Sequence, residues 1–481
     1  MLFNSFIYLR FLVVVFILYW LVFGKMRHAR MSQNLFLVLA SYIFYGWWNW
    51  KFLGLIAFTT ACSYVSGLMI ERSRHKSLIL WTNVVIYIGI LFIYKYYGFF
   101  VENLNLLLQS TGIHLDFVTL DLILPLGISF YTFQALSYLI DVYRGDLPAT
   151  RDAAAFWAYI SFFPQLVAGP IERATNLLPQ FQRERTFDYS TGVDGMRQIL
   201  WGLFKKMVIA DNCALVVNNT FQYFHDQTAL SLWVGAILFA FQIYGDFSGY
   251  SDMAIGTAKL FGIKLMTNFR YPYFSRSISE VWRRWHISLT SWFRDYVYIP
   301  LGGNRHGKAK TTRNVISVYL ISGLWHGANW TFIVWGLYNA MFFIPVIISG
   351  RKKKYDTIVA HGRRLPSLRD AMMILVTFTL FTIGWTIFRS ANISDALQYI
   401  SMMFVNPNTS TEFVGTYSLT WIGIMLIIEW LGREHDCPLF FDNSSPKILH
   451  YRTVRWIIYL VLFTACLIAS GTQDEFIYFQ F

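Results

Sequence analysis

Long apolar runs alternate with short polar stretches along almost the whole chain. Most of them approach the ~20 residues that a helix needs to cross a ~30 Å hydrocarbon core. The eleven runs cover Phe6–Gly24, Leu35–Trp50, Leu53–Ile70, Leu78–Tyr97, Leu122–Ile140, Ile199–Val217, Leu230–Tyr244, Thr331–Ile348, Met372–Phe388, Val414–Trp430 and Trp456–Ala469. The pattern predicts an all-α polytopic membrane protein with about 11–12 transmembrane helices.

Three further apolar runs, Phe156–Ala168, Met253–Gly262 and Val315–Trp325, are shorter. Runs of this length are typical of re-entrant, interfacial or internally packed segments. A helix over Val315–Trp325 would span only ~16 Å at 1.5 Å per residue. We therefore expect the residue that follows it, His326, to lie near the middle of the membrane.

Two polar stretches, Asp141–Gln198 and Ser251–Asn314, are long enough to hold structure of their own. Both are rich in aromatic and arginine residues, which favours interfacial helices over separate soluble domains. No internal repeat or low-complexity linker occurs. The sequence thus predicts one membrane domain over residues 1–481.

Composition supports the membrane assignment. Apolar residues make up 56% of the chain and charged residues 14%, and the mean hydropathy is +0.43. These values exclude a disordered chain and argue against a soluble globule. The net charge of +13 comes from loops between apolar runs, so it indicates membrane orientation rather than nucleic-acid binding. The four cysteines show no CxxC spacing, and we expect neither a disulfide framework nor a metal site.

The basic loops alternate with loops that lack lysine and arginine. Basic residues follow the first and third apolar runs and recur at 351–369 and 433–455, whereas Gly98–Asp121, Asn218–Ala229 and Ser470–Phe481 contain none. By the positive-inside rule the basic loops are cytoplasmic. The asymmetry predicts a multi-pass protein of the cytoplasmic membrane with both termini outside.

His326 is the first candidate for chemistry, because ionisable residues within a membrane are costly and often functional. It lies between apolar runs, and Gly323, Gly327 and Ala328 would let a backbone or a ligand approach it. A neutral imidazole there could act as a general base. A core histidine bonded to a carbonyl or hydroxyl group is the competing interpretation. Trp325 and Asn329 flank this position as candidate substrate-binding residues.

His286 is the second candidate. Ser277 and Glu280 form a capping box that predicts the start of a helix extending to Tyr296. His286 falls on the apolar stripe of this amphipathic helix, as an ordinary interfacial histidine also would. On the opposite face, two arginines could bind an anionic substrate: Arg283 and Arg284.

Polar side chains in two further segments could contribute to a site. In the segment 242–253, Asp246, Ser248 and Asp252 lie at the end of an apolar run. The two acids could bind a cation, cap the helix expected over Met253–Gly262 or pair with loop arginines.

A polar stripe also follows the fifth apolar run. It consists of Tyr131, Gln134, Tyr138 and Asp141 and would either line a wet cavity or bond between spans. Gln165 lies in an apolar segment broken by Gly169-Pro170, which is typical of a segment that packs inside the protein or lines a cavity.

Six segments in this order resemble the membrane-bound O-acyltransferase (MBOAT) family. They are Pro125–Gly145, Pro164–Ile171, Gly245–Ala254, Trp282–Leu289, Trp292–Arg305 and Trp325–Gly327. The resemblance covers the whole chain. It is strongest to the bacterial AlgI-like branch, which includes the membrane subunit of alginate O-acetylation, and weaker to the D-alanyl transfer protein DltB.

The resemblance implies a central tunnel with His326 as the catalytic histidine and His286 as the second histidine on the cytoplasmic side. It also implies acetyl-CoA as donor, no bound cofactor and a periplasmic SGNH-type acetyltransferase as partner in O-acetylation of an extracytoplasmic polysaccharide. Either an acetyl-histidine intermediate or direct base-assisted transfer is compatible with these residues.

Two other functions also fit the sequence. A transporter or channel without chemistry would use the same polar stripe and broken segments, although the inverted repeat common in transporters is absent. A lipid or protein O-acyltransferase would share the histidines but take another acyl donor.

Overall fold

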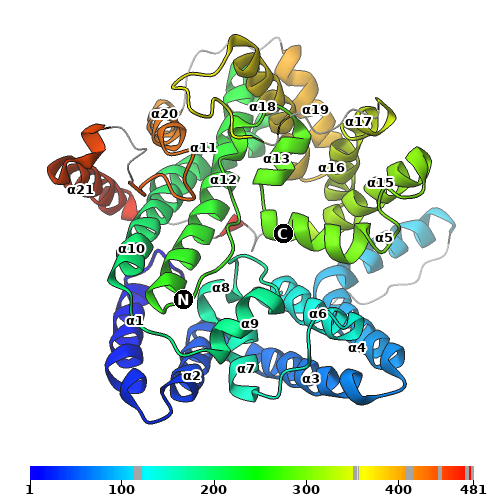
Figure 1. Cartoon of the computed structure of the whole chain (residues 1–481). Helices are drawn as coiled ribbons and strands as arrows, with labels where there is room; N and C mark the ends of the chain where they lie inside the picture. The colour runs from blue at the N-terminus through cyan, green and yellow to red at the C-terminus, as the bar shows by residue number, and fades with distance from the viewer. Residues whose placement is uncertain are drawn as a thin grey trace. The chain divides into compact units, whose positions relative to one another are not determined.

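The computed structural model describes residues 1–112, 122–349, 355, 357–406, 415–441, 447–471 and 476–477. Within these residues the chain is helical and forms no β-strand (Figure 1). The all-α prediction is therefore confirmed. The basic residues Arg351–Lys354, much of the bare loop before Leu122 and most of the last bare segment lie outside the described residues.

The chain folds into two compact units. The first comprises Met1–Gly195 and Ala254–Met266, and the second comprises Met196–Met253 and Thr267–Phe481. In the first unit α3 packs against α4 and α6, and α7 packs against α2 and α9. Its helices are α1 (Phe6–Ile17), α2 (Ala29–Asn49), α3 (Leu53–Arg72), α4 (Lys76–Leu91), α5 (Tyr97–Ser110), α6 (Ile128–Arg144), α7 (Ala153–Ser161), α8 (Phe163–Leu166) and α9 (Ala174–Gln182).

The second unit holds both candidate histidines. It contains α11 (Asp211–Gln222), α13 (Ile278–Arg284), α14 (Ile287–Phe293), α15 (Gly307–His326), α16 (Trp330–Met341), α17 (Ile344–Ser349), α18 (Leu368–Arg389), α19 (Ile393–Phe404), α20 (Thr416–Leu431) and α21 (Arg452–Ile468). Two helices have residues in both units, α10 (Tyr189–Leu203) and α12 (Ala229–Leu260). The π-helical turn η5 (Phe204–Ala210) continues α10 into α11.

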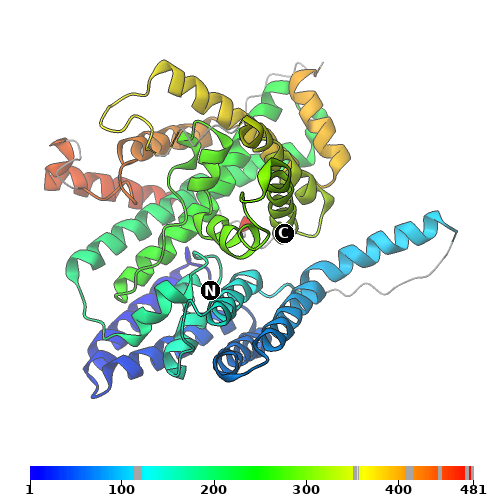
Figure 2. The ribbon, with the colours of Figure 1, turned by 45° about the vertical axis from the view of Figure 1, so that its right-hand side comes forward.

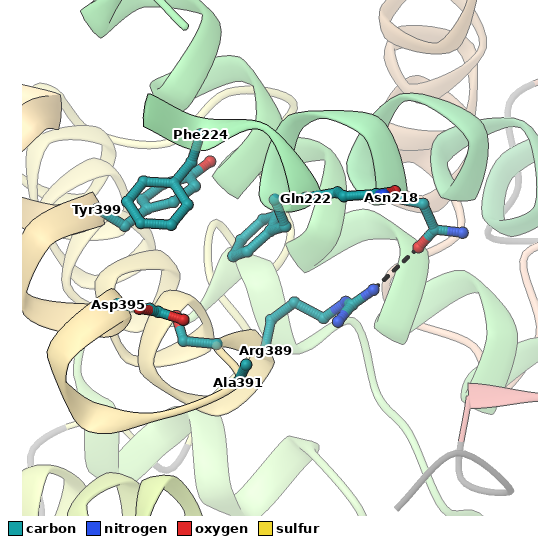
Figure 3. Close-up of a pocket in the computed structure, with 9 residues that line it drawn as sticks. Asn218, Gln222, Phe224, Arg389, Ala391, Asp395 and Tyr399 are labelled. Carbon is teal, nitrogen blue, oxygen red and sulfur yellow. Dashed lines mark hydrogen bonds between the residues drawn. The ribbon is translucent and has the colours of Figure 1, made fainter. Parts of the chain in front are cut away.

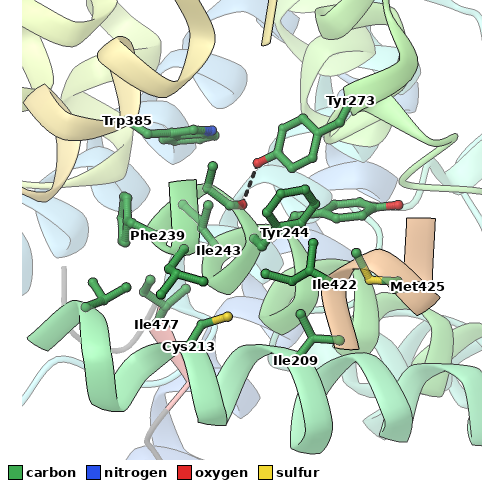
Figure 4. Packing of buried hydrophobic residues seen from close by; sticks show 14 of the residues in the cluster. Ile209, Cys213, Phe239, Ile243, Tyr244, Tyr273, Trp385, Ile422, Met425 and Ile477 are labelled. Atoms are coloured by element: carbon green, nitrogen blue, oxygen red, sulfur yellow. Dashed lines mark hydrogen bonds between the residues drawn. The ribbon is translucent and has the colours of Figure 1, made fainter. Parts of the chain in front are cut away.

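Buried aromatic rings form the core of the second unit. The rings of Tyr244 and Tyr273 pack in a tilted arrangement with centroids 5.1 Å apart, and Trp385 lies on the same side of the cluster as Tyr273 (Figure 4). The hydroxyl of Tyr273 donates to the carbonyl of Ala240 at 2.5 Å. Such hydrogen bonding lets a polar ring edge stay inside an apolar core.

Among the described residues, seven helical runs are long and apolar enough to cross a membrane. Two of them exceed a single crossing: Ala29–Arg72 with 44 residues and Lys76–Ser110 with 35 residues, the latter visible as one extended helix in Figure 2. The first of these consists of α2 and α3, which separate at the extended residue Asn49 and correspond to two predicted spans. Other predicted spans correspond to shorter helices, since α6 has 17 residues and α20 has 16.

Apolar side chains cover much of the outer surface of these helices. Phe6 is 67% exposed, Trp81 61% and Ile468 75%. A soluble protein rarely exposes large apolar side chains at such density. The exposure is what a lipid-facing surface requires, and it agrees with a polytopic membrane protein.

Two of the shorter predicted segments differ from expectation. Met253–Gly262 is no separate segment, because α12 continues without a break to Leu260. Asp246 and Asp252 therefore lie inside a helix, and the capping role considered for them is wrong. Val315–Trp325 forms the last part of α15, whose 20 residues extend ~30 Å at 1.5 Å per residue. The apolar run thus underestimates the length of the helix that ends at His326.

Candidate active site

His326 is the last residue of α15, where the chain turns toward α16. Gly323 allows these helices to pack closely, because a side chain there would meet the carbonyl group of Phe332. A Cβ atom on Gly327 would overlap the ring of Phe332. The small residues near His326 thus accommodate the neighbouring helix.

Among the described residues, three aromatic rings pack around His326, which is 4% exposed. Its ring centroid lies 4.9 Å from that of Trp325, 5.1 Å from that of Trp335 and 5.3 Å from that of Phe388. All three contacts are edge-to-face, with interplanar angles of 79–85°. Edge-to-face packing fixes the orientation of a ring, and apolar walls of this kind exclude water from a reacting group.

The backbone breaks at His286, so the single helix predicted from Ser277 to Tyr296 is wrong. The expected start is confirmed, since the Ser277 hydroxyl accepts from the Glu280 amide at 3.2 Å. However, α13 ends at Arg284, and His286 adopts φ 44° and ψ 53° before α14 begins. This left-handed conformation costs a residue with a side chain about 1–2 kcal/mol. The sequence does not reveal it, because the apolar residues on both sides keep helical spacing.

Asn268 holds the chain in this break. Its carbonyl accepts from the Ile287 amide at 2.9 Å, and its side-chain oxygen accepts from the Ser288 hydroxyl at 2.9 Å. Its Nδ2 in turn donates to Ser251 at 3.1 Å. Asn268 is fully buried, so these bonds fix the turn that orients His286.

The imidazole of His286 is also enclosed by rings. Its centroid lies 4.6 Å from that of Phe247, 5.8 Å from that of Trp325 and 6.5 Å from that of Phe269. Burial lowers the pKa of His286 to about 3, so the imidazole is neutral at cellular pH. Trp325 contacts both candidate histidines, and the structure therefore brings His286, Trp325 and His326 into one site.

The contacts made along helix α18 show near which of its two ends each candidate residue lies. The described contacts, from its first turn to its last, pair Asp370 with Arg276, Phe381 with Trp282 and Trp285, and Phe388 with His326. Asp370 and Phe388 are separated by ~27 Å along a helix axis. Arginine side chains thus lie near the end of α18 that follows the basic loop, and His326 lies near the opposite end.

Arg283 and Arg284, the two candidate substrate-binding arginines, form hydrogen bonds with other residues of the protein. Arg284 donates to the buried carboxylate of Glu280 at 2.8 Å. Arg283 donates to the carbonyl of Tyr355 at 2.8 Å and to Ser279 at 3.3 Å. A third arginine at this place, Arg276, also pairs with Glu280 and lies over the Tyr355 ring at 4.5 Å. Sequence reasoning missed Arg276 and Glu280 as members of this cluster.

Asp246, Ser248 and Asp252 contact two buried lysines rather than a loop. Lys206 Nζ lies 2.7 Å from Asp246 and 2.8 Å from Asp211. The two acids of α12 are thus paired, as one alternative expected, but their partners are buried lysines and the expectation of loop arginines is wrong.

The neighbouring lysine completes this network. Lys205 Nζ lies 2.6 Å from Asp252 and 2.9 Å from the Ser248 hydroxyl. Asp246 also accepts from the Ile477 amide at 2.6 Å, which ties the end of the described chain to α12. Sequence reasoning missed the lysines, although two adjacent charges inside the apolar run Ile199–Val217 were the available signal.

Glycines make this buried network possible. A Cβ atom on Gly249 would lie 2.7 Å from the carbonyl of Gly202, and one on Gly245 would lie 2.8 Å from the carbonyl of Lys205. Both contacts are too close for a side chain, so only glycine lets the end of α10 and the η5 turn approach α12. The π-helical turn then presents Lys205 and Lys206 side by side toward the same helix.

The remaining candidates include four residues of the first unit. Gln165 Nε2 donates to the Gln134 side-chain oxygen at 2.6 Å, and Gln134 Nε2 donates to the Tyr159 carbonyl at 2.7 Å. The Tyr138 hydroxyl accepts from the Thr150 amide at 3.2 Å. Tyr131 is 1% exposed and, like the others, buried within this unit. The bonds of Gln134 and Tyr138 match the hydrogen-bonding interpretation of the polar stripe.

Asn329 has a local role next to His326. Its side chain accepts from the Thr331 amide at 3.0 Å and so caps α16. Its Nδ2 donates to the carbonyl of Ala391 at 2.9 Å. The turn after His326 is thereby attached to the segment that follows α18.

Comparison with known proteins defines the class to which this fold and site belong. A model of the membrane-bound O-acyltransferase family, MBOAT, matches residues 147–380. The probable alginate O-acetylase AlgI of Azotobacter vinelandii is 41% identical over 519 residues, which cover 100% of both chains. The chain therefore belongs to the membrane-bound O-acyltransferase family and is a multi-pass membrane O-acyltransferase.

Two further relatives show the breadth of the similarity. The peptidoglycan O-acetyltransferase of Helicobacter pylori is 35% identical over 100% of this chain and 98% of its own. The teichoic acid D-alanyltransferase of Streptococcus thermophilus is 30% identical over 55% of this chain and 68% of its own. The resemblance to the AlgI-like branch is confirmed, with the D-alanyl transfer proteins more distant. An enzyme is thereby favoured over a transporter without chemistry.

Proposed function

We propose that this protein transfers an acetyl group from cytoplasmic acetyl-CoA to an acceptor outside the cytoplasmic membrane. The acetyl group then serves O-acetylation of an extracytoplasmic polysaccharide. The observation that carries the proposal is the contact of both buried imidazoles with the same indole, that of Trp325. Two histidines in one dry, ring-walled site can act on one reacting carbonyl group.

The donor enters at the arginine cluster in this account. Arg276, Arg283 and Arg284 lie on or beside α13, and α18 there follows the basic loop. Each guanidinium carries five N–H donors, so the contacts to Glu280 and Tyr355 leave capacity for phosphate oxygens. The thioester of acetyl-CoA would then reach inward past His286.

His286 polarises the thioester and does not accept the proton. A group whose pKa is lowered to about 3 by burial is a weak base at neutral pH, whereas a neutral imidazole N–H still donates to a carbonyl oxygen. The left-handed backbone conformation of His286 holds its imidazole in one orientation, toward Trp325. Such preorganised donors stabilise the negative charge that develops on the carbonyl oxygen.

His326 acts as the base in direct transfer. Its imidazole takes the proton of the acceptor hydroxyl as that oxygen attacks the thioester carbonyl. The new C–O bond forms, the C–S bond breaks, and CoA leaves as a thiolate that is protonated by the imidazolium. The products are the O-acetyl ester and free CoA, and His326 returns to its neutral state.

In this proposal the acyl acceptor reaches the site from the extracytoplasmic side of the membrane. The AlgI relatives are named for alginate and the Helicobacter relative for peptidoglycan, which are polymers of the cell exterior. We infer that the protein works there with a periplasmic SGNH-type acetyltransferase. The basic loops are cytoplasmic and both termini are outside.

Release of free CoA by purified protein tests the reaction. Acetyl-CoA should be cleaved, and addition of the periplasmic partner and an oligosaccharide should raise the rate about tenfold or more, because an acceptor completes the transfer. Palmitoyl-CoA serves as the control donor. Faster cleavage of palmitoyl-CoA would identify a lipid or protein acyltransferase, and no cleavage of any thioester would contradict the proposed function.

A further inference from the structure

A pocket of about 470 Å³ lies at the C-terminal end of α18. One wall comes from the end of α11 and the turn after it, and the other comes from the α18–α19 connection and α19 (Figure 3). Arg389 lines the pocket and is the last residue of α18, whose 22 residues are apolar enough to cross a membrane. A helix of this length extends ~33 Å, slightly more than the ~30 Å hydrocarbon core. The pocket therefore lies at the depth where phospholipid head groups begin.

Large apolar side chains are exposed beside the pocket. Leu397 on α19 is 63% exposed, and Tyr223, directly after α11, is 50% exposed. The opposite face of α19 is buried through Ala396, Tyr399 and Met403. A short amphipathic helix with further apolar residues on its outer face is typical of a membrane interface. The acyl chains of a lipid bound at the pocket would find an apolar surface next to it.

The pocket carries both signs of charge. Arg389 donates to the Asn218 side-chain oxygen at 3.0 Å, and its guanidinium points toward Asn218 and away from Asp395 (Figure 3). The carboxylate of Asp395 accepts from the Asn392 side chain at 2.9 Å, and it lies on the same side of the view as Tyr399 (Figure 3). Among the described residues that line the pocket, Arg389 and Asp395 are the charged ones. A ligand with a single kind of charge would be attracted by one of them and repelled by the other.

Both charged groups can accept a further partner. A guanidinium has five N–H donors and a carboxylate about four acceptor positions, so the bonds to Asn218 and Asn392 use only part of this capacity. The guanidinium of Arg389 also lies 5.7 Å from the ring centroid of Phe221, which stacks on Tyr399 with centroids 4.5 Å apart. These rings provide an apolar lining between the two charged ends.

We propose that this pocket binds the head group of a phospholipid that carries both a phosphate and a primary amine. Arg389 pairs with the phosphate, because a guanidinium binds phosphate through two parallel bonds. The amides of Asn218 and Gln222 donate to the same group. The ammonium group pairs with Asp395, and the methylene groups between the two charges pack on Phe221. The inference does not rest on the proposed function, because lipid binding requires no acyl transfer.

The volume and the position of the pocket favour a lipid head group over other ligands. The volume of about 470 Å³ falls in the range of pockets for small ligands, roughly 300–1,000 Å³, whereas a stable protein partner needs a buried area of about 1,200–2,000 Å² in total. A soluble phosphoamine would fill the same volume, but it would leave the exposed Leu397 and Tyr223 uncovered. The proposal therefore requires the head group and the acyl chains to belong to one molecule.

The lipid would also support the turn after His326. Ala391 lines the pocket, and its carbonyl accepts from the Asn329 side chain at 2.9 Å. Arg389 directly follows Phe388, whose ring centroid lies 5.3 Å from that of His326. A head group held by Arg389 thus lies beside the segment that attaches this turn.

Native mass spectrometry of the full-length protein in detergent tests the pocket with two added lipids. Phosphatidylethanolamine carries the phosphate and the amine, and phosphatidylglycerol carries the phosphate alone. The parent should bind phosphatidylethanolamine about tenfold more tightly or better, equivalent to about 1.4 kcal/mol. Arg389→Gln should weaken the binding of both lipids. Asp395→Asn should weaken phosphatidylethanolamine about tenfold and should not weaken phosphatidylglycerol, because it removes only the partner of the amine.

Two matched controls remove the same charges from exposed residues of the first unit, Arg27→Gln and Asp146→Asn. Both should bind the two lipids as the parent does. Asp395→Asn keeps an oxygen that accepts from Asn392, so the start of α19 is preserved, and thermal unfolding shows whether each variant is folded. Unchanged binding of phosphatidylethanolamine by Asp395→Asn, or an equal loss for both lipids, would overturn the proposal.

Glycerophosphoethanolamine, which is the same head group without acyl chains, distinguishes a lipid from a soluble ligand. It should bind about tenfold more weakly than the lipid or worse. Equal affinity would show that the pocket takes a soluble phosphoamine, and the proposal would be wrong. Loss of thioester cleavage with intact lipid binding would instead contradict the proposed function alone.

Discussion

The imidazole of His286 and the indole of Trp325 pack with their ring centroids 5.8 Å apart. Because Trp325 also contacts its neighbour His326 at 4.9 Å, one side chain sets the position of both imidazoles. The contact depends on the left-handed turn at His286, which aims that ring at the end of α15. The two histidines consequently belong to one site even though 40 residues of sequence separate them.

Replacement of Trp325 should therefore impair the reaction of both histidines. We expect Trp325→Ala to lower kcat about 100-fold or more, since misplacement of reacting groups by about 1 Å can cost that much. Trp325→Phe keeps a ring in the same place and should retain at least about a tenth of the rate. Rates of CoA release at saturating acetyl-CoA measure the effect.

Trp330→Ala provides the control, because Trp330 is 50% exposed and lies four residues beyond His326. Thermal unfolding in detergent shows whether each variant is folded. Full activity of a folded Trp325→Ala protein would show that the shared indole has no part in the reaction.

His286 allows its backbone role and its chemical role to be separated. His286→Gly suits the positive φ of 44° and should be about 1 kcal/mol more stable than His286→Ala, although both variants lose the packing of the buried imidazole and should be less stable than the parent. His286→Asn tolerates this conformation and keeps an N–H donor. We expect activity to follow the order histidine, asparagine, then glycine and alanine together.

Paired measurements of stability and rate on the three variants test this order. If activity instead follows stability, with glycine the most active variant, His286 would have a structural role only.

Only part of this arrangement could be predicted from the sequence. Apolar runs predict the helices well, because helix surfaces that face lipid and helix surfaces that face the core are both apolar. His326 could be identified as a candidate because it is an ionisable residue within an apolar stretch of sequence. The break at His286 could not be predicted, since the apolar spacing continues through it and only tertiary bonds to Asn268 impose it. The same holds for Asp246, whose partner Lys206 lies on another helix.

The buried network makes a separate prediction about stability. Lys206 lies 2.8 Å from Asp211 and 2.7 Å from Asp246, so Lys206→Met leaves two buried carboxylates without this cation. Breaking a buried ion pair in this way costs about 3–5 kcal/mol. The midpoint of thermal unfolding should fall sharply.

Lys310→Met is the control, because Lys310 is exposed and its loss should shift the midpoint little. The double variant Lys206→Met/Asp246→Asn should be more stable than Lys206→Met alone, since one buried charge is removed. An unchanged midpoint in Lys206→Met would show that the network does not stabilise the fold.

The proposed orientation is tested by labelling introduced cysteines with a membrane-impermeant maleimide. Gln109→Cys lies at the exposed end of α5, and Leu365→Cys lies in the basic loop, where Leu365 is 76% exposed. The background carries Cys62→Ser, because the other three native cysteines are buried. Basic loops should be cytoplasmic.

Gln109→Cys should therefore react in intact cells, and Leu365→Cys should react only after permeabilisation. Labelling of Leu365→Cys in intact cells, with Gln109→Cys protected, would reverse the orientation.

Acetyl transfer by His326→Asn compared with the parent and with His286→Asn tests the central claim most directly. Asparagine can donate a hydrogen bond but cannot accept a proton as a base, so His326→Asn should fall to background while His286→Asn retains measurable transfer. The assay follows radiolabelled acetyl from acetyl-CoA to an acceptor oligosaccharide at equal amounts of folded protein. Near-normal transfer by His326→Asn would contradict the assignment of His326 as the base.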